Sequence, residues 1–363
     1  MKKASVYVKG DRNSTAYYRI YQYLDNITDI QCGYKMMMSP YIHNKYMPIS
    51  KQSIWIKVLV YLHIYMRMLF ALVKDLIQAP DVIVIHRRII SRFMPLSYKC
   101  LLTLLKMRKT KIVWDFDDNI TEVGEVSLST FDFYSKISDT IIVTHNYLKD
   151  MVKDEYRGKV EIMPTTDGDM YKCFEDDSLN TQRLSDFNEE LRLVWVATSS
   201  NLKYLNDIIP TLETTATKIK EQNKRLKLVV VCDLPLKHNC HILSVENIKW
   251  TRNAAIEAMK YGHIGLMPLA NNSFTKGKGG FKLVQYVSIG LPCIGSNVGY
   301  NTHVLSNDAG ILVNSDQDWE DAIITLSNID VWKQYSKNAY DQWNAQFSFI
   351  ANLNRWKCIL THS

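Results

Sequence analysis

Residues 276–292 read KGKGGFKLVQYVSIGLP, and this stretch decides the fold. Three lysines and three glycines precede an apolar segment that Gly290 and Pro292 end, which predicts a glycine-rich loop entering a helix. The next run, residues 293–296, predicts a strand. Glycine lets backbone amides approach an anion closely, and the first N–H groups of a helix are free. The stretch therefore predicts α/β structure with a site suited to a diphosphate; a basic loop capping an ordinary helix is the alternative.

Strand and helix patterns alternate on both sides of this stretch. We expect strands over residues 6–9, 81–86, 111–115, 140–144, 160–164, 191–196, 226–231, 263–267 and 292–296. Helices are expected over residues 319–326, 331–345 and 350–360 near the end of the chain. Alternation of this kind predicts parallel sheets covered by helices on both faces.

This α/β pattern predicts two tandem doubly wound, Rossmann-like domains facing a central cleft. At 363 residues the chain is long enough for two domains. We place an N-terminal acceptor-binding domain at residues 1–172, a polar linker at 173–190 and a donor-binding domain at 191–345. Residues 346–363 are predicted to form a helix that packs back on the N-terminal domain.

The cysteines and the N-terminal residues indicate the cellular compartment of the protein. The seven cysteines are scattered, odd in number and never arranged as CxxC, which disfavours a disulfide framework and a zinc site. Residues 1–8 lack the long apolar stretch of a signal peptide and predict a first strand instead. We therefore expect a cytoplasmic protein, with peripheral contact at the inner face of the membrane as an extension of that expectation.

Charge is distributed unevenly. Residues 1–111 hold 19 Lys and Arg against 5 Asp and Glu, a net charge of +14, and the remainder carries −7. An imbalance of this size attracts an anionic partner such as a lipid headgroup, a lipid-linked phosphate or a nucleic acid. Residues 54–74 of this third are apolar, with His63, Arg67 and Lys74 on one helical face. They predict a helix packed on a sheet or lying in an anionic membrane interface, rather than a spanning segment.

Several stretches together resemble bacterial GT-B fold glycosyltransferases of the family 4 type, in the polysaccharide biosynthesis branch. The resemblance is specific over residues 263–301 and moderate elsewhere. It rests on residues 265–269, 276–282, 285–286, 290–292 and 296–301, on the opening of the second domain at 195–205, and on residues 17–20 and 114–120.

The resemblance implies transfer of a sugar from a nucleotide-sugar, usually with retention of anomeric configuration and without a bound metal. By matching positions, the backbone amides of Gly279, Gly280 and Phe281 would face the diphosphate. The cations Lys203, Lys278 and Lys282 would neutralise charge on the leaving group. Further donor contacts are expected from Ser199, Ser200 and, at the ribose, Gln285.

The chain departs from the family pattern at several positions. The usual pair of glutamates, eight residues apart, is absent: Gln285 stands where the second would be, and Gly277 or a neighbouring lysine where the first would be. His263 occupies a place where an aspartate is common. Where many members carry a histidine after a central N-domain strand, this chain has the run 115–118, DFDD.

That acidic run supplies the candidate catalytic residues Asp115, Asp117 and Asp118. They lie at the end of a predicted strand, where a parallel sheet places its ligands. Carboxylates there could accept hydrogen bonds from sugar hydroxyls, or one could act as base toward the acceptor. Helix capping is the alternative, and a two-carboxylate metal site is a weaker one. After the first strand, Arg12, Asn13 and Tyr17 are candidate acceptor contacts.

The leading hypothesis is a glycosyltransferase acting on a saccharide acceptor, lipid-linked, in surface polysaccharide biosynthesis, with no cofactor and no metal. A nucleotide-sugar epimerase or a phosphate-polyol transferase on the same scaffold, and a non-catalytic glycosyltransferase-like subunit, remain alternatives. A nucleic-acid glucosylating enzyme is disfavoured, because the sequence shows no Lys/Arg-rich arm and no recognisable groove-reading helix.

Overall fold

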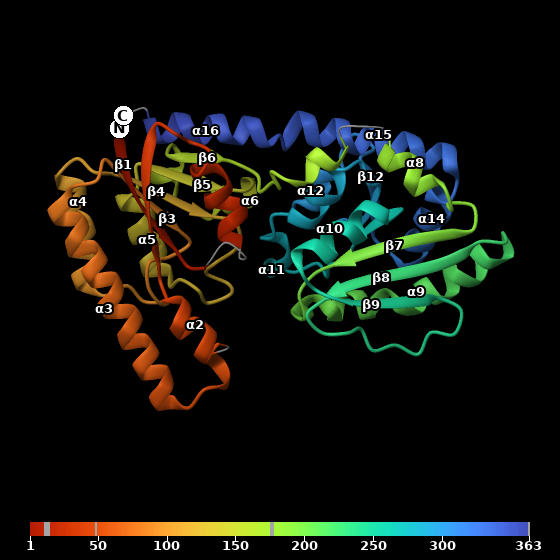
Figure 1. Ribbon diagram of the computed structural model, residues 1–363, viewed down its shortest axis with the longest axis horizontal. Helices are drawn as coiled ribbons and strands as arrows, with labels where there is room; N and C mark the ends of the chain where they lie inside the picture. The colour runs from red at the N-terminus through yellow and green to blue at the C-terminus, as the bar shows by residue number, and fades with distance from the viewer. Residues whose placement is uncertain (11–14, 48, 175–177, 362–363) are drawn as a thin grey trace. The chain divides into compact units, whose positions relative to one another are not determined.

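The computed structural model describes residues 1–10, 15–47, 49–174 and 178–361 (Figure 1). Contacts divide the chain into two compact units. Unit 1 comprises Met1–Thr165 with Ile350–Ser363, and unit 2 comprises Thr166–Phe349.

Unit 1 is built on a six-stranded parallel sheet with the strand order β2-β1-β3-β4-β5-β6. Each pair keeps a regular register; Val84 of β3, for example, lies opposite Val113 of β4. The strands are β1 (Lys2–Val8), β2 (Ile30–Met36), β3 (Val82–His86), β4 (Lys111–Phe116), β5 (Thr140–Val143) and β6 (Val160–Ile162).

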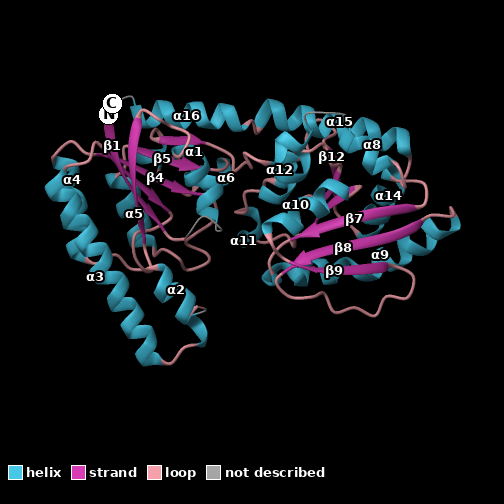
Figure 2. Ribbon diagram, in the orientation of Figure 1, coloured by secondary structure: helices cyan, strands magenta, loops and turns pink. Residues whose placement is uncertain are grey.

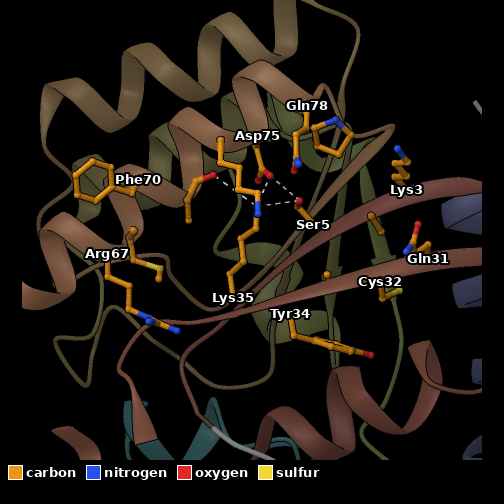
Figure 3. A pocket seen from close by; sticks show the side chains of 16 residues that line it. Lys3, Ser5, Gln31, Cys32, Tyr34, Lys35, Arg67, Phe70, Asp75 and Gln78 are labelled. Atoms are coloured by element: carbon orange, nitrogen blue, oxygen red, sulfur yellow. Dashed lines mark hydrogen bonds and ion pairs between the residues drawn. The ribbon is translucent and has the colours of Figure 1, made fainter. Parts of the chain in front are cut away.

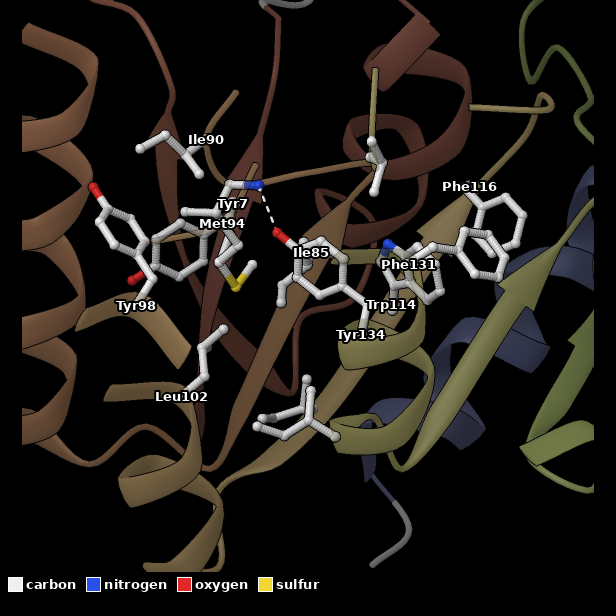
Figure 4. Packing of buried hydrophobic residues seen from close by; sticks show 14 of the residues in the cluster. Tyr7, Ile85, Ile90, Met94, Tyr98, Leu102, Trp114, Phe116, Phe131 and Tyr134 are labelled. Carbon is white, nitrogen blue, oxygen red and sulfur yellow. Dashed lines mark hydrogen bonds between the residues drawn. The ribbon is translucent and has the colours of Figure 1, made fainter. Parts of the chain in front are cut away.

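One face of this sheet carries an aromatic core beneath α3, α4 and α5. Figure 4 shows the rings of Trp114, Phe116, Phe131 and Tyr134 grouped together, and all four are buried. The helices of unit 1 are η1 (Tyr17–Tyr21), α1 (Gln22–Leu24), α2 (Pro40–Tyr46), η2 (Ile49–Lys51), α3 (Ile54–Gln78), α4 (Leu96–Met107), α5 (Leu128–Ile137), α6 (Asn146–Asp150), α7 (Asp154–Arg157) and α16 (Phe349–Thr361).

The C-terminal helix α16 completes unit 1. Trp356 is fully buried and stacks on Tyr23 with ring centroids 6.5 Å apart. Asn352 donates to the carbonyl of Pro164 at 2.9 Å, and Lys111 donates to the carbonyl of Ile359 at 2.8 Å. These contacts attach the last helix to a sheet formed more than 180 residues earlier in the chain.

Unit 2 repeats the design with a second six-stranded parallel sheet, ordered β12-β11-β10-β7-β8-β9 (Figure 2). Its strands are β7 (Glu190–Val196), β8 (Arg225–Cys232), β9 (Ser244–Lys249), β10 (Ile264–Met267), β11 (Cys293–Ser296) and β12 (Gly310–Val313). Its helices are η3 (Met170–Phe174), α8 (Ser178–Leu184), η4 (Ser199–Asn201), α9 (Leu202–Glu221), α10 (Arg252–Tyr261), α11 (Ser273–Lys276), α12 (Phe281–Val287), α13 (Asn301–Val304), α14 (Asp316–Leu326) and α15 (Ile329–Gln346).

Helices cover both faces of this second sheet. Alternate residues of β7 point to opposite faces, so Leu193 packs in the cluster with α9 and α14, whereas Val194 packs in the cluster with α10 and α12. The doubly wound α/β prediction is therefore confirmed.

Three strands were not predicted: β2, β9 and β12. Each lies at an edge of its sheet. β9 reads SVENIK and has no fully buried residue, and β2 reads IQCGYKM with only its first residue buried. A strand that is paired on one side and partly exposed needs less apolar sequence than a central strand, so the apolar pattern that revealed the central strands is weak in β2 and β9. This reason does not apply to β12, which reads GILV. The polar stretch expected as a linker, residues 173–190, contributes α8 to unit 2.

His263 is a buried histidine at the start of β10. Its Nδ1 accepts from the backbone N–H of Arg192 at 2.9 Å, and its Nε2 lies 2.7 Å from the carbonyl of Arg183, to which it donates. Burial, with the nearby Arg192 guanidinium, lowers the pKa of His263 to about 3. The neutral ring is therefore part of the packing between β7, α8 and β10.

We predict that unit 2 loses stability on acidification because of His263. Since the pKa is about 3 in the folded protein and about 6.5 in an unfolded chain, the unfolded state binds the extra proton first. Stability is fully present above about pH 6.5 and falls by up to ~1.4 kcal/mol per pH unit below it. Urea unfolding at pH 7.5, 6 and 5 measures this slope.

His263→Asn is the matched control, because its side-chain oxygen keeps an acceptor for the Arg192 N–H but has no ring to protonate. The difference in unfolding free energy between the two proteins should shrink as the pH falls. A difference that stays constant from pH 7.5 to pH 5 would contradict the prediction.

Candidate functional site

The glycine-rich loop turns sharply into α12. Gly280 caps this helix in the left-handed region, with φ 59° and ψ 18°. A Cβ at Gly280 would lie 3.2 Å from Val304, and one at Gly299, also left-handed, would lie 2.9 Å from the backbone of Lys276. Glycine is required at both positions because left-handed backbone and tight packing coincide. The loop therefore holds its backbone amides in a fixed turn against residues 299–304.

Lys278 connects this loop to the loop that follows β7. Its ammonium donates to Oδ1 of Asn201 at 2.6 Å. The same ammonium lies 5.0 Å from the ring centre of Phe274 and 5.7 Å from that of Tyr204, distances typical of cation–π contacts. Two segments about 75 residues apart in sequence are thus brought together at the carboxyl ends of β7 and β10, and both were predicted to bind the donor.

The side chains of Ser199, Ser200 and Lys203, which were predicted to bind the donor, have different surroundings. The backbone N–H and hydroxyl of Ser199 both donate to Asp233, at 2.6 and 2.7 Å. Partial desolvation would raise the pKa of that exposed carboxyl, but these hydrogen bonds hold it below its usual range. The Ser200 hydroxyl lies 3.0 Å from that of Thr198. Lys203 is exposed, with its ammonium 4.9 Å from the ring centre of Tyr204. Ser199 therefore fixes the loop through Asp233, and Lys203 faces solvent.

Lys282 belongs to a chain of three side chains. Its ammonium donates to Oε1 of Gln285 at 3.0 Å, and Nε2 of Gln285 donates to Oδ2 of Asp167 at 2.8 Å. Gln285 and Asp167 are almost fully buried. Burial lowers the pKa of Lys282 to about 8, and the negative charge of Asp167 opposes that shift. The ammonium is thus protonated at neutral pH and oriented from behind by an amide that an aspartate holds in place.

Asp167 has further partners that fix its position. Its Oδ1 accepts from the backbone N–H groups of Asp169 and Met170, at 3.0 and 3.3 Å. The Arg252 guanidinium lies 3.8 Å from the same oxygen and forms an ion pair with Asp169. Each end of the Gln285 amide makes a contact inside the protein, and the side chain is almost fully buried. This geometry favours a role in orienting Lys282 over the predicted contact with a ribose.

In unit 1, Asp115 is fully enclosed. Its carboxylate forms an ion pair with Arg19 and lies 2.8 Å from Nδ1 of His86. Arg19, itself buried, also donates to the carbonyl of Met163 at 2.5 Å. A carboxylate with no exposed surface and a guanidinium partner is a poor base toward a substrate. This geometry argues for a structural role of Asp115, joining β3, β4 and the segment after β6, in place of the predicted catalytic role.

Asp117 and Asp118 share one guanidinium. Arg87 donates to Asp117 at 2.7 Å and to Asp118 at 2.6 Å, and its third nitrogen reaches Glu125 at 3.2 Å. Burial alone would raise the pKa of Asp117, but Arg87, with His86 and Arg19, holds it well below its usual range. Asp117 is buried, whereas the side chain of Asp118 is 36% exposed. Of the three aspartates, Asp118 is the one whose carboxylate solvent reaches.

Arg87 itself adopts a left-handed backbone, with φ 61°. For a residue with a side chain this conformation costs on the order of 1 kcal/mol. Its carbonyl accepts from the indole of Trp114 at 3.1 Å. The strained turn aims the guanidinium at the carboxyl ends of β3 and β4, where the acidic side chains lie.

Among the predicted acceptor contacts, Arg12 and Asn13 lie outside the described residues. Tyr17 begins η1 and is half-buried, with its ring edge-on to Tyr18 at 5.2 Å. Within the described ranges, no group of three or more His, Cys, Asp or Glu side chains is arranged to hold a metal ion.

Comparison with known protein families gives a match within unit 2. The family described as glycosyl transferases group 1 matches residues 192–328, which include β7 to β12 and the glycine-rich loop. Unit 2 is therefore similar to group 1 glycosyl transferases over residues 192–328.

The whole chain is similar to several solved structures of the GT-B fold. Anabaena HepE in complex with UDP is 10% identical, with a TM-score of 0.66 and all of both chains covered. The Escherichia coli trehalose-6-phosphate structure with bound UDP-2-fluoro glucose is 11% identical, with a TM-score of 0.64, covering 100% of this chain and 99% of that one. UDP-GlcNAc 2-epimerase of Neisseria meningitidis is 12% identical, with a TM-score of 0.52, covering 98% and 100%. No curated protein matches the chain by sequence.

These matches confirm the resemblance to GT-B glycosyltransferases of the family 4 type. The positions that sequence reasoning missed in unit 2 are Asn201, Asp233, Asp167 and Arg252. Asp233 directly follows β8, so its place at the carboxyl end of a parallel strand was a readable signal. Asp167 had no such signal, because its contact with Gln285 spans 118 residues of sequence.

We predict that Asp167 sets the pH range over which Lys282 assists nucleotide binding. In the wild type the ammonium loses its proton as the pH rises through about 8. Asp167→Asn removes the charge that opposes this loss, so affinity for a nucleoside diphosphate should start to decline at a lower pH. At pH 7.5 the loss should be several-fold, on the order of 1 kcal/mol. Calorimetric titration with UDP from pH 6 to pH 9 measures both curves.

Asp169→Asn is the control, because Asp169 lies two residues away and binds Arg252 without touching Gln285. Its pH profile should follow that of the wild type. If Asp167→Asn weakens binding equally at every pH, the aspartate only supports the fold of the loop and the proposed link to Lys282 is wrong.

Proposed function

We propose that this protein transfers a sugar from a nucleoside diphosphate sugar to a saccharide acceptor. The observation that carries the proposal is that Lys278, the Gly279–Gly280 turn and Lys282 follow one another at the start of α12, within the residues that match the group 1 glycosyl transferase family. A diphosphate leaving group gains negative charge as the sugar departs, and fixed cations and amides stabilise that charge. The proposed donor is a UDP-sugar, because the similar structures of HepE and of the E. coli protein hold UDP and UDP-2-fluoro glucose.

Each residue has a distinct task in this mechanism. The amides of Gly279, Gly280 and Phe281 face the diphosphate, and Lys282 approaches it from the first turn of α12. Lys278 and the solvent-facing Lys203 add positive charge from the two loops. Gln285 serves as a positioning residue for Lys282 rather than as the expected ribose contact, since both ends of its amide are engaged. No metal is assigned a task.

For the acceptor we propose a lipid-linked saccharide of surface polysaccharide biosynthesis, glycosylated with retention in the cytoplasm at the inner face of the membrane. The resemblance to family 4 enzymes supports retention, and the basic residues 1–111 support an anionic, lipid-linked acceptor. Asp118 is the candidate for contact with an acceptor hydroxyl, with Tyr17, Arg12 and Asn13 as further acceptor contacts. The similarity to the epimerase lies in the fold alone, and no feature of the donor loop favours epimerisation or phosphate-polyol transfer over glycosyl transfer.

Replacement of Lys282 by Ala tests the donor site. Loss of a charge-assisted contact to a phosphate should weaken UDP binding by about 1–3 kcal/mol. Lys276→Ala is the matched control: Lys276 belongs to the same loop and is exposed, so its removal should change affinity little. Calorimetry that finds equal UDP affinities for the wild type and Lys282→Ala would contradict the proposal that this loop binds the diphosphate.

Turnover should persist without a divalent ion. With a panel of nucleotide-sugars as donors, release of the nucleoside diphosphate should be the same in excess EDTA as in magnesium or manganese. The reason is that Lys278, Lys282 and the loop amides supply the charge that a metal would supply. Activity that disappears in EDTA and returns with a metal would show that the cations are insufficient. A protein that binds UDP but releases none from any sugar would favour the non-catalytic subunit.

A further inference from the structure

Helix α3 carries an apolar stripe on its outer face. The stripe residues recur every three or four positions, which places them along one side of the helix. Trp55, Leu59, Phe70 and Ile77 are between 65% and 78% exposed. The full stripe, named here the α3 stripe, is Ile54, Trp55, Val58, Leu59, Leu62, Met66, Phe70, Val73 and Ile77.

The opposite face of the same helix is buried in unit 1. Val60, Ile64, Met68 and Leu72 pack in the core above the sheet. The helix is long and apolar enough to cross a membrane by length and composition, but one of its sides packs against the rest of unit 1. The outer face of such a helix can contact a partner while the inner face stays packed on the sheet. An exposed apolar surface that runs along a whole helix marks a site of interaction.

A basic groove borders the α3 stripe. It has a volume of about 840 Å³ and lies between α3, the edge strand β2 and its neighbour β1. Lys3, Lys35, Arg67 and Lys74 line it, against the single carboxylate of Asp75 (Figure 3). Phe70 lines the groove and also belongs to the α3 stripe, so the apolar and basic surfaces are continuous.

The groove keeps a surplus of positive charge. Asp75 is buried and already accepts from Ser5 at 2.8 Å, from Tyr7 at 2.7 Å and from Lys35. Figure 3 shows Lys35 reaching from β2 to Asp75 and Ser5. Lys3, Arg67 and Lys74 are exposed, and the Arg67 Nε donates to the carbonyl of Met36 at 3.0 Å. Three cations therefore remain around the groove after Asp75 is matched by Lys35.

We propose that α3 lies flat in an anionic membrane surface, with the α3 stripe inserted among acyl chains and the groove holding an anionic lipid headgroup. A helix of 25 residues covers about 38 Å of the interface. Trp55 is placed at the end of the stripe, and Arg67 and Lys74 lie beside it, an arrangement that suits an interfacial helix. The inference identifies the surface behind the proposed lipid-linked acceptor, but its geometry is independent of the donor site.

Charge distinguishes this partner from a second copy of the chain. Two copies that met through the α3 stripe would bring two basic grooves close together, and like charges in contact repel. An anionic lipid surface instead matches the groove and the +14 charge of residues 1–111.

The test uses the full chain with vesicles of phosphatidylcholine alone or with 30% phosphatidylglycerol. Leu59→Gln with Leu62→Gln should lower partitioning to the anionic vesicles at least about tenfold, because two exposed apolar side chains no longer insert. Lys3→Gln with Lys74→Gln should lower it roughly 30-fold at low salt and much less at 0.5 M salt. All four positions are exposed in the structure, so these variants should keep the wild-type unfolding midpoint.

Matched controls come from unit 2. Leu234→Gln with Ile242→Gln, and Lys220→Gln with Lys333→Gln, change the same numbers of exposed apolar and basic side chains and should bind vesicles like the wild type. Every variant should also bind UDP as the wild type does, and a wild type that fails to bind UDP counts against the proposed function alone.

Three results would overturn the inference. One is a wild type that binds neither kind of vesicle, and another is a stripe variant that partitions as well as the wild type. The third is a wild-type dimer, seen by analytical ultracentrifugation, that dissociates in the stripe variant, since a second copy would then cover the stripe. Equal binding to neutral and anionic vesicles would contradict the proposal that the groove binds an anionic headgroup.

Discussion

Parallel strands cannot be joined by a tight turn, since each strand must begin at the same end of the sheet as its neighbour. Most successive strands are therefore joined through a helix, although residues 233–243 between β8 and β9 form a loop without one. In both units the connecting helices bury the sheet. Packing is close where they meet it: a Cβ at Gly265 of β10 would lie 2.4 Å from the ring of Tyr286 in α12. With the faces closed, polar side chains collect at the carboxyl ends of the strands. Asp115 to Asp118 do so in unit 1, and Asp233 and the two lysine-bearing loops do so in unit 2.

The two units treat buried charge in opposite ways. In unit 1, guanidinium groups neutralise the acidic side chains at the strand ends: Arg19 pairs with Asp115, and Arg87 with Asp117 and Asp118. These ion pairs hold the carboxylates in place and reduce the free-energy cost of keeping them ionised inside the protein. In unit 2, the ammonium of Lys282 meets an amide first and a carboxylate only behind it. A cation that is only partly compensated retains more affinity for an incoming anion than one already paired.

Sequence patterns revealed the central strands and the glycine-rich loop because both have local signatures: continuous apolar runs, and glycines spaced among lysines. The edge strands β2 and β9 were not predicted because an edge strand does not need a fully apolar sequence. The same limit applied to the site. Lys278, Lys282 and the glycines were recognisable in one short stretch, whereas Asp167 acts on that stretch from 118 residues away. The roles of Asp115 and Gln285 depended on partners that no local pattern specifies: Arg19 for the first, and Asp167 with Lys282 for the second.

The amide of Gln285 also limits how this position can change in evolution. It presents its oxygen to a cation and its nitrogen to an anion 2.8 Å away, a polarity that a carboxylate cannot reproduce. A glutamate at position 285 would place two negative charges in contact inside the protein unless Asp167 changed as well. The two positions should therefore vary together among relatives: an acidic residue at 285 should be accompanied by a neutral residue at 167. A protein that changed Gln285 to glutamate alone would have a repulsive contact between that residue and Asp167.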